Sequence, residues 1–319
     1  MDSPIPVLVL FGPTASGKTS ILQKLFNSNS SLQAEIVSAD SMQVYRGMNI
    51  GTAKPTAEEQ QKLPHHLIDI RYPSQQFNVG DFVRLADAAC LQIVSNGKLP
   101  VVSGGTGFYL KNFIIGLSEA PPSDMEIRNQ LKLEFREKDS AVLMEELTAC
   151  DPVSAGRIHI NDEYRLVRAL EVYRSCGRPL SSFEVISEKE SESRRRFRFI
   201  IIGLSRPRAE IYHRINVRCA EMFRLGLASE VRSLFEAGYT PDDPGLRAIG
   251  YREFFIEDDE NPGKWRLLED LSGVLELIAQ NSRRYAKRQI TFFKGIPDVK
   301  WIEVGHNEIK TINEIKRNL

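Results

Sequence analysis

The chain has 319 residues, of which 42% are hydrophobic and 26% charged, and its 42 basic residues are matched by 42 acidic ones. The length predicts one large domain that carries a smaller insertion, while a net charge of zero counts against attraction of nucleic acid by the molecule as a whole. No apolar segment approaches the length of a membrane span and the amino terminus lacks the pattern of a secretory signal, so we expect a cytoplasmic protein without membrane association.

The first predicted strand, residues 6–11, is apolar and is followed by a glycine-rich loop and a helix-like segment, residues 21–26. The loop consists of Gly12, Pro13, Thr14, Ala15, Ser16, Gly17, Lys18 and Thr19. In such a strand, loop and helix, the backbone N–H groups point inward, the lysine supplies positive charge and the threonine hydroxyl ligates Mg²⁺. The segment therefore predicts a site for a group with two or more phosphates, with Mg²⁺ as a cofactor held by Thr19.

Two further apolar strands are predicted at residues 36–38 and 100–103, and helices separate them, one of which begins at Asn78. Strands that alternate with helices are typical of a parallel sheet covered on both faces. Ligands of such sheets bind at the carboxyl ends of the strands. The phosphate loop, Asp40 after the second strand and the turn at residues 104–107 should therefore converge on one cleft.

From residue 118 to residue 193 the alternating pattern stops and the apolar spacing is helical. We therefore expect an all-helical insertion domain over 118–193, and a core built from residues 1–117 and 194–319. After the insertion the pattern predicts a strand at 197–204, a long helix over 267–293, and a short strand at 299–303 before a frayed tail. The predicted fold class is α/β, a P-loop kinase-like parallel sheet flanked by helices.

Asp40 is the candidate for acid–base chemistry because it follows the strand expected next to the phosphate loop. Motor and switch NTPases usually carry a Mg²⁺-binding acid at the end of a neighbouring apolar strand, but the strand at 100–103 runs into Ser103 and a glycine. The position of Asp40 suits a base that acts on an acceptor, as in small-molecule kinases. The alternative is a turn-forming aspartate without a chemical role. A P-loop small-molecule kinase and an RNA-binding module with a vestigial loop both stay open at this point.

Basic residues gather in two segments in spite of the zero net charge. Between Arg194 and Arg218 there are eight arginines and one acid. Nearer the carboxyl end, a helical segment places Arg284, Lys287 and Arg288 on one side. A solvated helix face is the alternative, but the two segments together indicate a surface that follows phosphates. They predict a polyanionic partner larger than a nucleotide.

Distinctive motifs extend beyond the phosphate loop, over most of the chain. They are D-S-M-Q-V-Y at 40–45, N-I-G-T-A-K-P at 49–55, P-H-H-L-I-D at 64–69, G-G-T-G at 104–107, R-I-H with N-D at 157–162, R-A-L-E-V at 168–172, A-I-G-Y at 248–251 and R-Y-A-K-R-Q at 284–289. In these motifs the chain resembles the tRNA dimethylallyltransferases, also called tRNA isopentenyltransferases. The resemblance extends from residue 7 to about residue 295.

The resemblance implies transfer of a dimethylallyl group from dimethylallyl diphosphate to N6 of adenosine 37 in tRNAs that read codons beginning with U. It also implies a channel that the flipped base enters from one end and the diphosphate from the other. Lys18, the loop amides, Thr19 with Mg²⁺, and Arg218 would stabilise the leaving diphosphate. Asp40 would be the general base that accepts the N6 proton.

By the same resemblance, tRNA contacts fall on residues in several parts of the chain: Asp40, Ser41, Met42, Gln43, Thr106, Arg128, Tyr164, Arg165, Arg168, Arg252, Arg284, Lys287 and Arg288. The inserted domain would hold the anticodon stem-loop, and we expect the protein to be a monomer. Two positions depart from the usual pattern of the family, Ile160 in place of proline and Tyr164 in place of glutamine. The first affects the local loop geometry, and the second replaces one hydrogen-bonding side chain with one that can stack.

Overall fold

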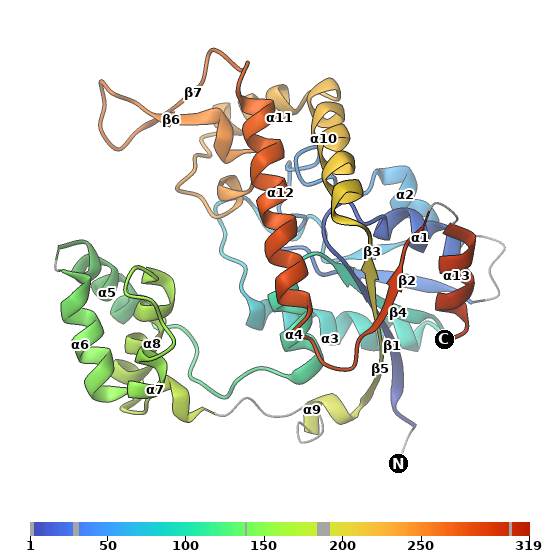
Figure 1. Cartoon of the computed structure of the whole chain (residues 1–319), viewed down its shortest axis with the longest axis horizontal. Helices are drawn as coiled ribbons and strands as arrows, with labels where there is room; N and C mark the ends of the chain where they lie inside the picture. The colour runs from blue at the N-terminus through green and yellow to red at the C-terminus, as the bar shows by residue number, and fades with distance from the viewer. Residues whose placement is uncertain (1–2, 28–31, 138, 184–191, 306–307) are drawn as a thin grey trace. The chain divides into compact units, whose positions relative to one another are not determined.

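The computed structural model describes the chain except for residues 1–2, 28–31, 138, 184–191 and 306–307. The chain divides into two compact units, a larger one of residues 1–114 with 192–319 and a smaller one of residues 115–191 (Figure 1). The insertion expected at 118–193 has its limits within three residues of those of the smaller unit.

The larger unit is built on a six-stranded sheet with the order β3-β2-β4-β1-β5-β8, in which all neighbouring strands are parallel. The strands are β1 (Ile5–Phe11), β2 (Ala34–Ser38), β3 (His65–His66), β4 (Leu99–Gly104), β5 (Phe197–Ser205) and β8 (Lys300–Glu303). The central strands are almost entirely buried because helices cover both faces of the sheet. The structure thus confirms the parallel α/β sheet that the sequence predicts.

Helices connect the strands of the larger unit and cover them (Figure 1). They are α1 (Lys18–Leu25), α2 (Ala57–Lys62), α3 (Val79–Ser95), α4 (Gly107–Ile115), α9 (Glu192–Arg195), α10 (Arg208–Arg224), α11 (Leu227–Glu236), α12 (Val274–Phe293) and α13 (Glu308–Lys316), with 3-10 turns at Gly245–Arg247 and Arg252–Phe254. Asn78 caps α3 as the sequence predicts, because its side chain accepts the N–H of Asp81 while the Asp81 carboxylate accepts the N–H of Asn78.

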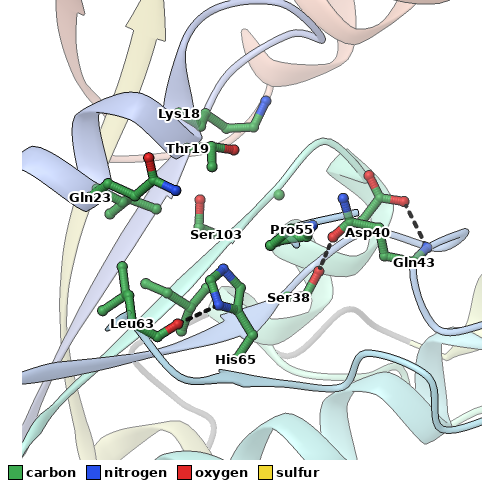
Figure 2. Close-up of a pocket in the computed structure, with 13 residues that line it drawn as sticks. Lys18, Thr19, Gln23, Ser38, Asp40, Gln43, Pro55, Leu63, His65 and Ser103 are labelled. Atoms are coloured by element: carbon green, nitrogen blue, oxygen red, sulfur yellow. Dashed lines mark hydrogen bonds between the residues drawn. The ribbon is translucent and has the colours of Figure 1, made fainter. Parts of the chain in front are cut away.

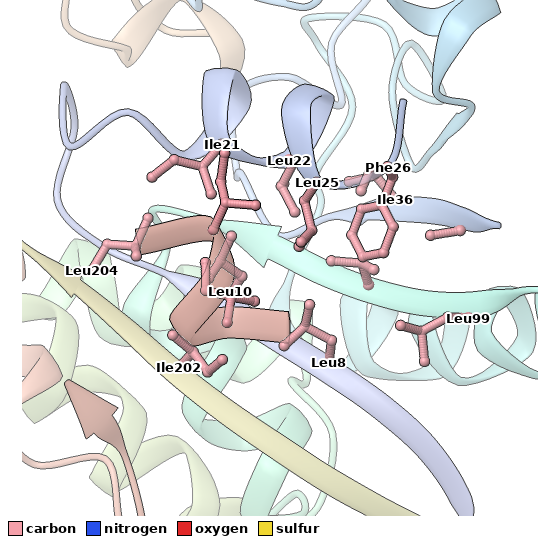
Figure 3. Packing of buried hydrophobic residues seen from close by; sticks show 14 of the residues in the cluster. Leu8, Leu10, Ile21, Leu22, Leu25, Phe26, Ile36, Leu99, Ile202 and Leu204 are labelled. Atoms are coloured by element: carbon pink, nitrogen blue, oxygen red, sulfur yellow. The ribbon is translucent and has the colours of Figure 1, made fainter. Parts of the chain in front are cut away.

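An apolar cluster fastens α1 to the sheet directly behind the phosphate loop (Figure 3). Leu8 and Leu10 of β1 pack in this cluster with Ile21 and Leu25 of α1, and all four side chains are at most 1% exposed. Burial of one such side chain contributes about 1.5–3 kcal/mol. The strand before the loop and the helix after it are therefore held rigidly, and the loop between them has fixed ends.

Two expectations about the carboxyl-terminal part are wrong. The helix expected over 267–293 begins only at Val274, because Trp265–Leu267 is a strand, β7, paired antiparallel with β6 (Phe255–Glu257). Between this hairpin and the helix, the N–H and hydroxyl of Ser272 donate to the Asp270 carboxylate, a local turn that competes with helix. The tail expected to be frayed forms α13, which buries side chains in the same apolar cluster as α1.

The smaller unit is helical throughout its described residues. It contains α5 (Met125–Glu137), α6 (Ser140–Cys150), α7 (Pro152–Ala155), α8 (Glu163–Cys176) and a 3-10 turn at Leu180–Ser182. Leucines of α5, α6 and α8 form its own core, with Leu131, Leu143 and Leu166 at most 1% exposed. Across the described part of the chain, no helix combines the length and the apolar character that a bilayer crossing requires.

Candidate active site

The phosphate loop follows β1 and has a closely packed backbone. A side chain at Gly12 would bring its Cβ within 2.8 Å of the backbone oxygen of Leu204, so the first glycine is required by close approach. Gly17 is left-handed, with φ of 99°, and forms the N-cap of α1. The Lys18 ammonium donates to the carbonyl oxygens of Gly12, at 2.9 Å, and Pro13, at 3.1 Å. The loop therefore already encloses the lysine charge.

Arginines that follow β5 or lie on α10 hold the loop from outside. The Arg206 guanidinium donates to the Ser16 carbonyl and that of Arg214 to the Ala15 carbonyl, each at 2.8 Å, while Arg218 reaches the Thr14 hydroxyl at 3.3 Å. These residues belong to the arginine-rich segment 194–218, for which the sequence predicts a phosphate-following surface. That interpretation is wrong for Arg206 and Arg214, which the sequence does not identify as loop supports.

The amino-terminal end of the same basic segment is also structural. The Arg194 guanidinium is buried and donates to the Asp87 carboxylate and to the Phe113 carbonyl, and Arg196 pairs with the same carboxylate at 2.7 Å. A count of charges cannot distinguish arginines that face solvent from arginines that hold elements together.

Asp40 belongs to the lining of two cavities. The Lys18 cavity, of about 70 Å³, is lined by Lys18, Thr19, Leu22, Gln23, Ile36, Ser38, Asp40, Gln43, Pro55, Leu63, His65, Ser103 and Gly104 (Figure 2). The Arg218 cavity, of about 300 Å³, has Thr14, Asp40, Ser41, Met42, Arg218, Tyr285 and Arg288 among its lining residues. The Asp40 carboxylate is oriented by the N–H groups of Met42 at 2.9 Å and Gln43 at 3.3 Å. The structure thus brings Asp40 together with Lys18 and Arg218, as the sequence predicts.

Desolvation shapes the electrostatics of this site. Burial lowers the pKa of Lys18 to about 8, with the charge of Asp40 opposing the shift and that of Arg218 adding to it. Burial likewise lowers the pKa of Arg218. Burial, together with the charge of Asp40, raises the pKa of Tyr285 to about 12. Two cations whose charged forms are disfavoured by desolvation make a site prepared for an anion.

Gln289 of α12 joins two loops of the site. Its side-chain amide donates to the Gly105 carbonyl at 2.7 Å and accepts the Thr14 N–H at 2.9 Å. Beside this bridge, the Thr106 hydroxyl oxygen accepts the N–H of Ser41 at 2.9 Å. The sequence analysis missed Gln289 and Tyr285. The available signal was their spacing of four residues on α12, which places them on one side of the helix.

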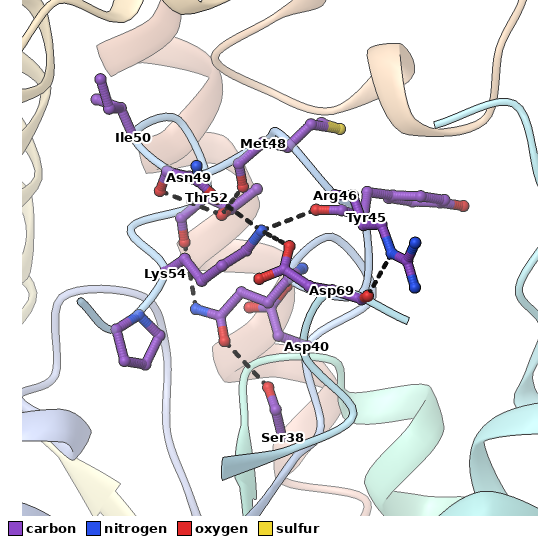
Figure 4. A network of polar contacts seen from close by, with 12 residues as sticks. Ser38, Asp40, Tyr45, Arg46, Met48, Asn49, Ile50, Thr52, Lys54 and Asp69 are labelled. Atoms are coloured by element: carbon purple, nitrogen blue, oxygen red, sulfur yellow. Dashed lines mark hydrogen bonds and ion pairs between the residues drawn. The ribbon is translucent and has the colours of Figure 1, made fainter. Parts of the chain in front are cut away.

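The segment after Asp40 is fixed by two polar networks. The Glu230 carboxylate accepts the N–H groups of Asn49, Ile50 and Gly51 and the Tyr251 hydroxyl, the last at 2.6 Å. Near it, the Lys54 ammonium bonds to Asp69 at 2.6 Å, to the Tyr45 carbonyl and to the Asn49 side chain (Figure 4). The Gln43 amide donates to the carbonyls of Thr52 and Ala53 and accepts the Ser38 hydroxyl. This loop is a rigid wall of the site.

Comparison with known proteins identifies the family. Residues 43–296 match a family described as IPP transferase, and residues 5–75 match one described as isopentenyl transferase. This chain belongs to the IPP transferase family. The resemblance derived from the sequence motifs is thereby confirmed.

Relatives of this IPP transferase align with nearly its full length. It is 42% identical to tRNA dimethylallyltransferase 1 of Pelobacter propionicus, over 93% of this chain and 92% of that protein. It is 41% identical to tRNA dimethylallyltransferase of Geobacter sulfurreducens, over 94% of this chain and 93% of that protein.

Solved structures agree with the fold. The full-length tRNA isopentenylpyrophosphate transferase of Bacillus halodurans superposes with a TM-score of 0.66 at 34% identity, over 99% of this chain and 97% of that one. A eukaryotic dimethylallyltransferase acting on tRNA superposes with a TM-score of 0.75 at 25% identity, over 98% and 77%. The α/β fold predicted from the sequence is that of these transferases.

The sequence-predicted RNA-binding residues of this IPP transferase fall in both units. In the larger unit, Arg252, Arg284, Lys287 and Arg288 are all exposed, and Arg288 also lines the Arg218 cavity. They lie on the 3-10 turn before β6 and on α12.

In the smaller unit the predicted residues have internal partners. Arg128 and Arg168 both reach the carboxylate of Glu171, at 3.1 and 3.2 Å, and Glu171 is fully buried. Arg165 pairs with Asp162 at 2.5 Å on the surface. Tyr164, 68% exposed, lies under the Arg128 guanidinium, which is 5.1 Å from the centre of its ring. The charges of Arg128 and Arg168 are therefore partly balanced within the unit.

Proposed function

We propose that this protein transfers a dimethylallyl group from dimethylallyl diphosphate to N6 of adenosine 37 in tRNAs that read codons beginning with U. The products are N6-(dimethylallyl)adenosine and diphosphate. The observation that carries the proposal is the position of Asp40, which lines both the Lys18 cavity and the Arg218 cavity. A single carboxylate between a phosphate loop and a second cavity suits transfer between two substrates. A small-molecule kinase is not favoured, because relatives over the whole chain are named as tRNA dimethylallyltransferases.

The diphosphate of the donor would bind the phosphate loop. Lys18 would exchange its bonds to the Gly12 and Pro13 carbonyls for diphosphate oxygens, and Arg218 would approach from α10. Cleavage of the allylic C–O bond places negative charge on the leaving diphosphate. Cations held in place before the reaction stabilise that charge without reorganisation.

Magnesium is part of the proposal. The Lys18 cavity presents the hydroxyls of Thr19, Ser38 and Ser103 and the carboxylate of Asp40, a set of hard oxygen donors that fits Mg²⁺. Thr19 would hold the ion together with the substrate. The ion would neutralise part of the diphosphate charge.

The acceptor base would occupy the Arg218 cavity, whose volume of about 300 Å³ is at the lower end of the usual range for ligand pockets. As the C–O bond of the donor breaks, the N6 nitrogen forms the new C–N bond and its proton passes to the Asp40 carboxylate. Tyr285 stays protonated beside Asp40, since its pKa is raised to about 12. It supplies a fixed hydrogen-bond donor to this end of the site.

Recognition of the tRNA completes the proposal. The exposed basic residues of α12 would follow the backbone of the anticodon loop, and the smaller unit, with Tyr164 and Arg165, would hold the anticodon stem. One monomer in the cytoplasm would act on one tRNA.

The test is incubation of the protein with radiolabelled dimethylallyl diphosphate, Mg²⁺ and unmodified tRNA, followed by nucleoside mass spectrometry. We expect label in the RNA and a new dimethylallyl adenosine, and neither with the Lys18→Ala variant. A parallel reaction with ATP as the only donor tests the kinase alternative. Consumption of ATP without any transfer of label to RNA would overturn the proposal.

A further inference from the structure

Two phenylalanines next to the site face solvent. Phe108, in the first turn of α4, is 52% exposed, and Phe292, in the last turn of α12, is 40% exposed. The Phe292 ring lies against Gly107, since a Cβ built there would come within 2.5 Å of its Cδ1 atom. The two helices therefore approach each other closely at this point (Figure 1). We call the two exposed residues at this approach, one on each helix, the Phe108–Phe292 platform.

The platform continues the basic face of α12. Arg284, Arg288 and Phe292 follow one another at intervals of four residues, which places them on one side of the helix, and all three are exposed. Arg288 also lines the Arg218 cavity, and Thr106, two residues before Phe108, holds the N–H of Ser41 beside Asp40. The platform therefore adjoins the mouth of the cavity that contains Asp40.

We propose that Phe108 and Phe292 stack against unpaired bases of the RNA loop that carries the target adenosine. This proposal rests on the proposed function and assigns it a further RNA contact. A target base that leaves its stack deprives its neighbours of a stacking partner, and an aromatic ring can replace that partner at each neighbour. RNA loops are recognised in this way, by stacking on aromatic side chains with cations on the phosphates.

The charge of the surroundings selects RNA over an apolar protein partner. Residues 284–297 contain no aspartate or glutamate and include the exposed Arg284, Lys287, Arg288 and Lys294, whereas Arg283 before them pairs with Glu276. A strip of positive charge on α12 that ends in the exposed Phe292 ring, with the exposed Phe108 on the neighbouring α4, matches a chain of alternating phosphates and bases.

The test is the affinity for a fluorescein-labelled anticodon stem-loop RNA, measured by anisotropy. We expect Phe292→Ala and Phe108→Ala each to raise Kd about tenfold, within the range for loss of one stacked base. Phe292→Trp should bind at least as tightly as the unchanged protein. Phe292→Leu fills the space against Gly107 but cannot stack, so it should lose affinity like the alanine variant. Leu225→Ala, at a residue 55% exposed after α10, is the matched control and should leave Kd unchanged.

A second RNA isolates the stacking contribution. One nucleotide beside the target adenosine is made abasic. The unchanged protein and the alanine variant of the phenylalanine that stacks on this nucleotide should then bind the RNA with equal Kd. Loss of affinity by the same factor for intact and abasic RNA at every loop position would overturn the proposal. So would an unchanged Kd of all variants, or a change of oligomeric state on light scattering without a change of Kd.

Transfer of label by the unchanged protein separates this proposal from the proposed function. If the unchanged protein modifies RNA while Phe108→Ala and Phe292→Ala bind RNA with the same Kd as the unchanged protein, only the stacking role of the platform is refuted. If the unchanged protein transfers no label, the proposed function is refuted first.

Discussion

The N–H of Thr14 in the phosphate loop donates to the side-chain oxygen of Gln289 at 2.9 Å. The nitrogen of the same amide donates to the Gly105 carbonyl, and the Gln289 side chain is buried. One residue of α12 therefore joins the loop after β1 to the loop after β4. Since the same turn of α12 carries the exposed Lys287 and Arg288, the basic side of this helix and the phosphate loop share a direct connection.

Replacing Gln289 with methionine should weaken both the fold and donor binding. The change keeps the volume but leaves the Thr14 N–H and the buried Gly105 carbonyl without this partner, and an unsatisfied buried group costs about 1–3 kcal/mol. We expect a loss of that order in urea unfolding and a raised KM for dimethylallyl diphosphate. Gln289→Glu keeps the acceptor for Thr14 but cannot donate to the Gly105 carbonyl and adds a negative charge beside the phosphate loop, so it should raise KM as well. A methionine variant with unchanged stability and KM would contradict this role.

Asp40→Asn should separate the chemical role of this side chain from its structural one. The asparagine retains an oxygen for the N–H groups of Met42 and Gln43 but cannot accept a proton. We expect kcat to fall by about 10² to 10⁴, the usual contribution of a general base, with Kd for tRNA unchanged. Single-turnover kinetics and filter binding measure the two quantities. Turnover close to that of the unchanged protein would leave Asp40 with only a turn-forming role.

The part of the site that could be predicted lies in consecutive residues. The phosphate loop and Asp40 each follow an apolar strand, so spacing and order alone place them at one edge of the sheet. Gln289 could not be found in this way, because its partners Thr14 and Gly105 are 275 and 184 residues away in sequence. The sequence around a buried glutamine on a helix does not indicate which groups it will bond to, because those groups become its neighbours only in the folded protein.

The errors in the fold have a related cause. Helix α13 is short, and its stability comes from packing Ile312 and Ile315 into the sheet's apolar cluster rather than from a strong sequence pattern. Strands β6 and β7 have three residues each, too few for periodicity to distinguish from the start of a helix. The arginines Arg206 and Arg214 were assigned to a surface because sequence records charge but not direction.

Donor affinity should fall as pH rises through about 8. Burial lowers the pKa of Lys18 to about 8, so the free protein loses this cation above that pH, while a bound diphosphate favours the protonated form. Kd for dimethylallyl diphosphate, measured by isothermal titration from about pH 7 to about pH 9, should therefore rise in the upper half of the range. Tyr285 does not interfere, since its pKa is raised to about 12. Lys18→Arg stays charged and should flatten the profile; a profile with the same slope in this variant would exclude Lys18 as its source.

Arg128 and Arg165 should respond differently to alanine substitution. Arg128→Ala removes one partner of the buried Glu171, so we expect a loss of about 1–3 kcal/mol in urea unfolding of the whole chain. Arg165 forms an exposed pair with Asp162, so Arg165→Ala should cost less than about 1 kcal/mol. If Arg165 binds a tRNA phosphate, its loss should reduce the slope of log K against log salt by roughly 0.7–0.9. Arg224→Ala breaks an exposed pair of the same i,i+3 spacing, with Glu221, and is the matched control with an unchanged slope. An unchanged slope for Arg165→Ala as well would remove Arg165 from the RNA-binding surface and leave its pairing with Asp162 as its role.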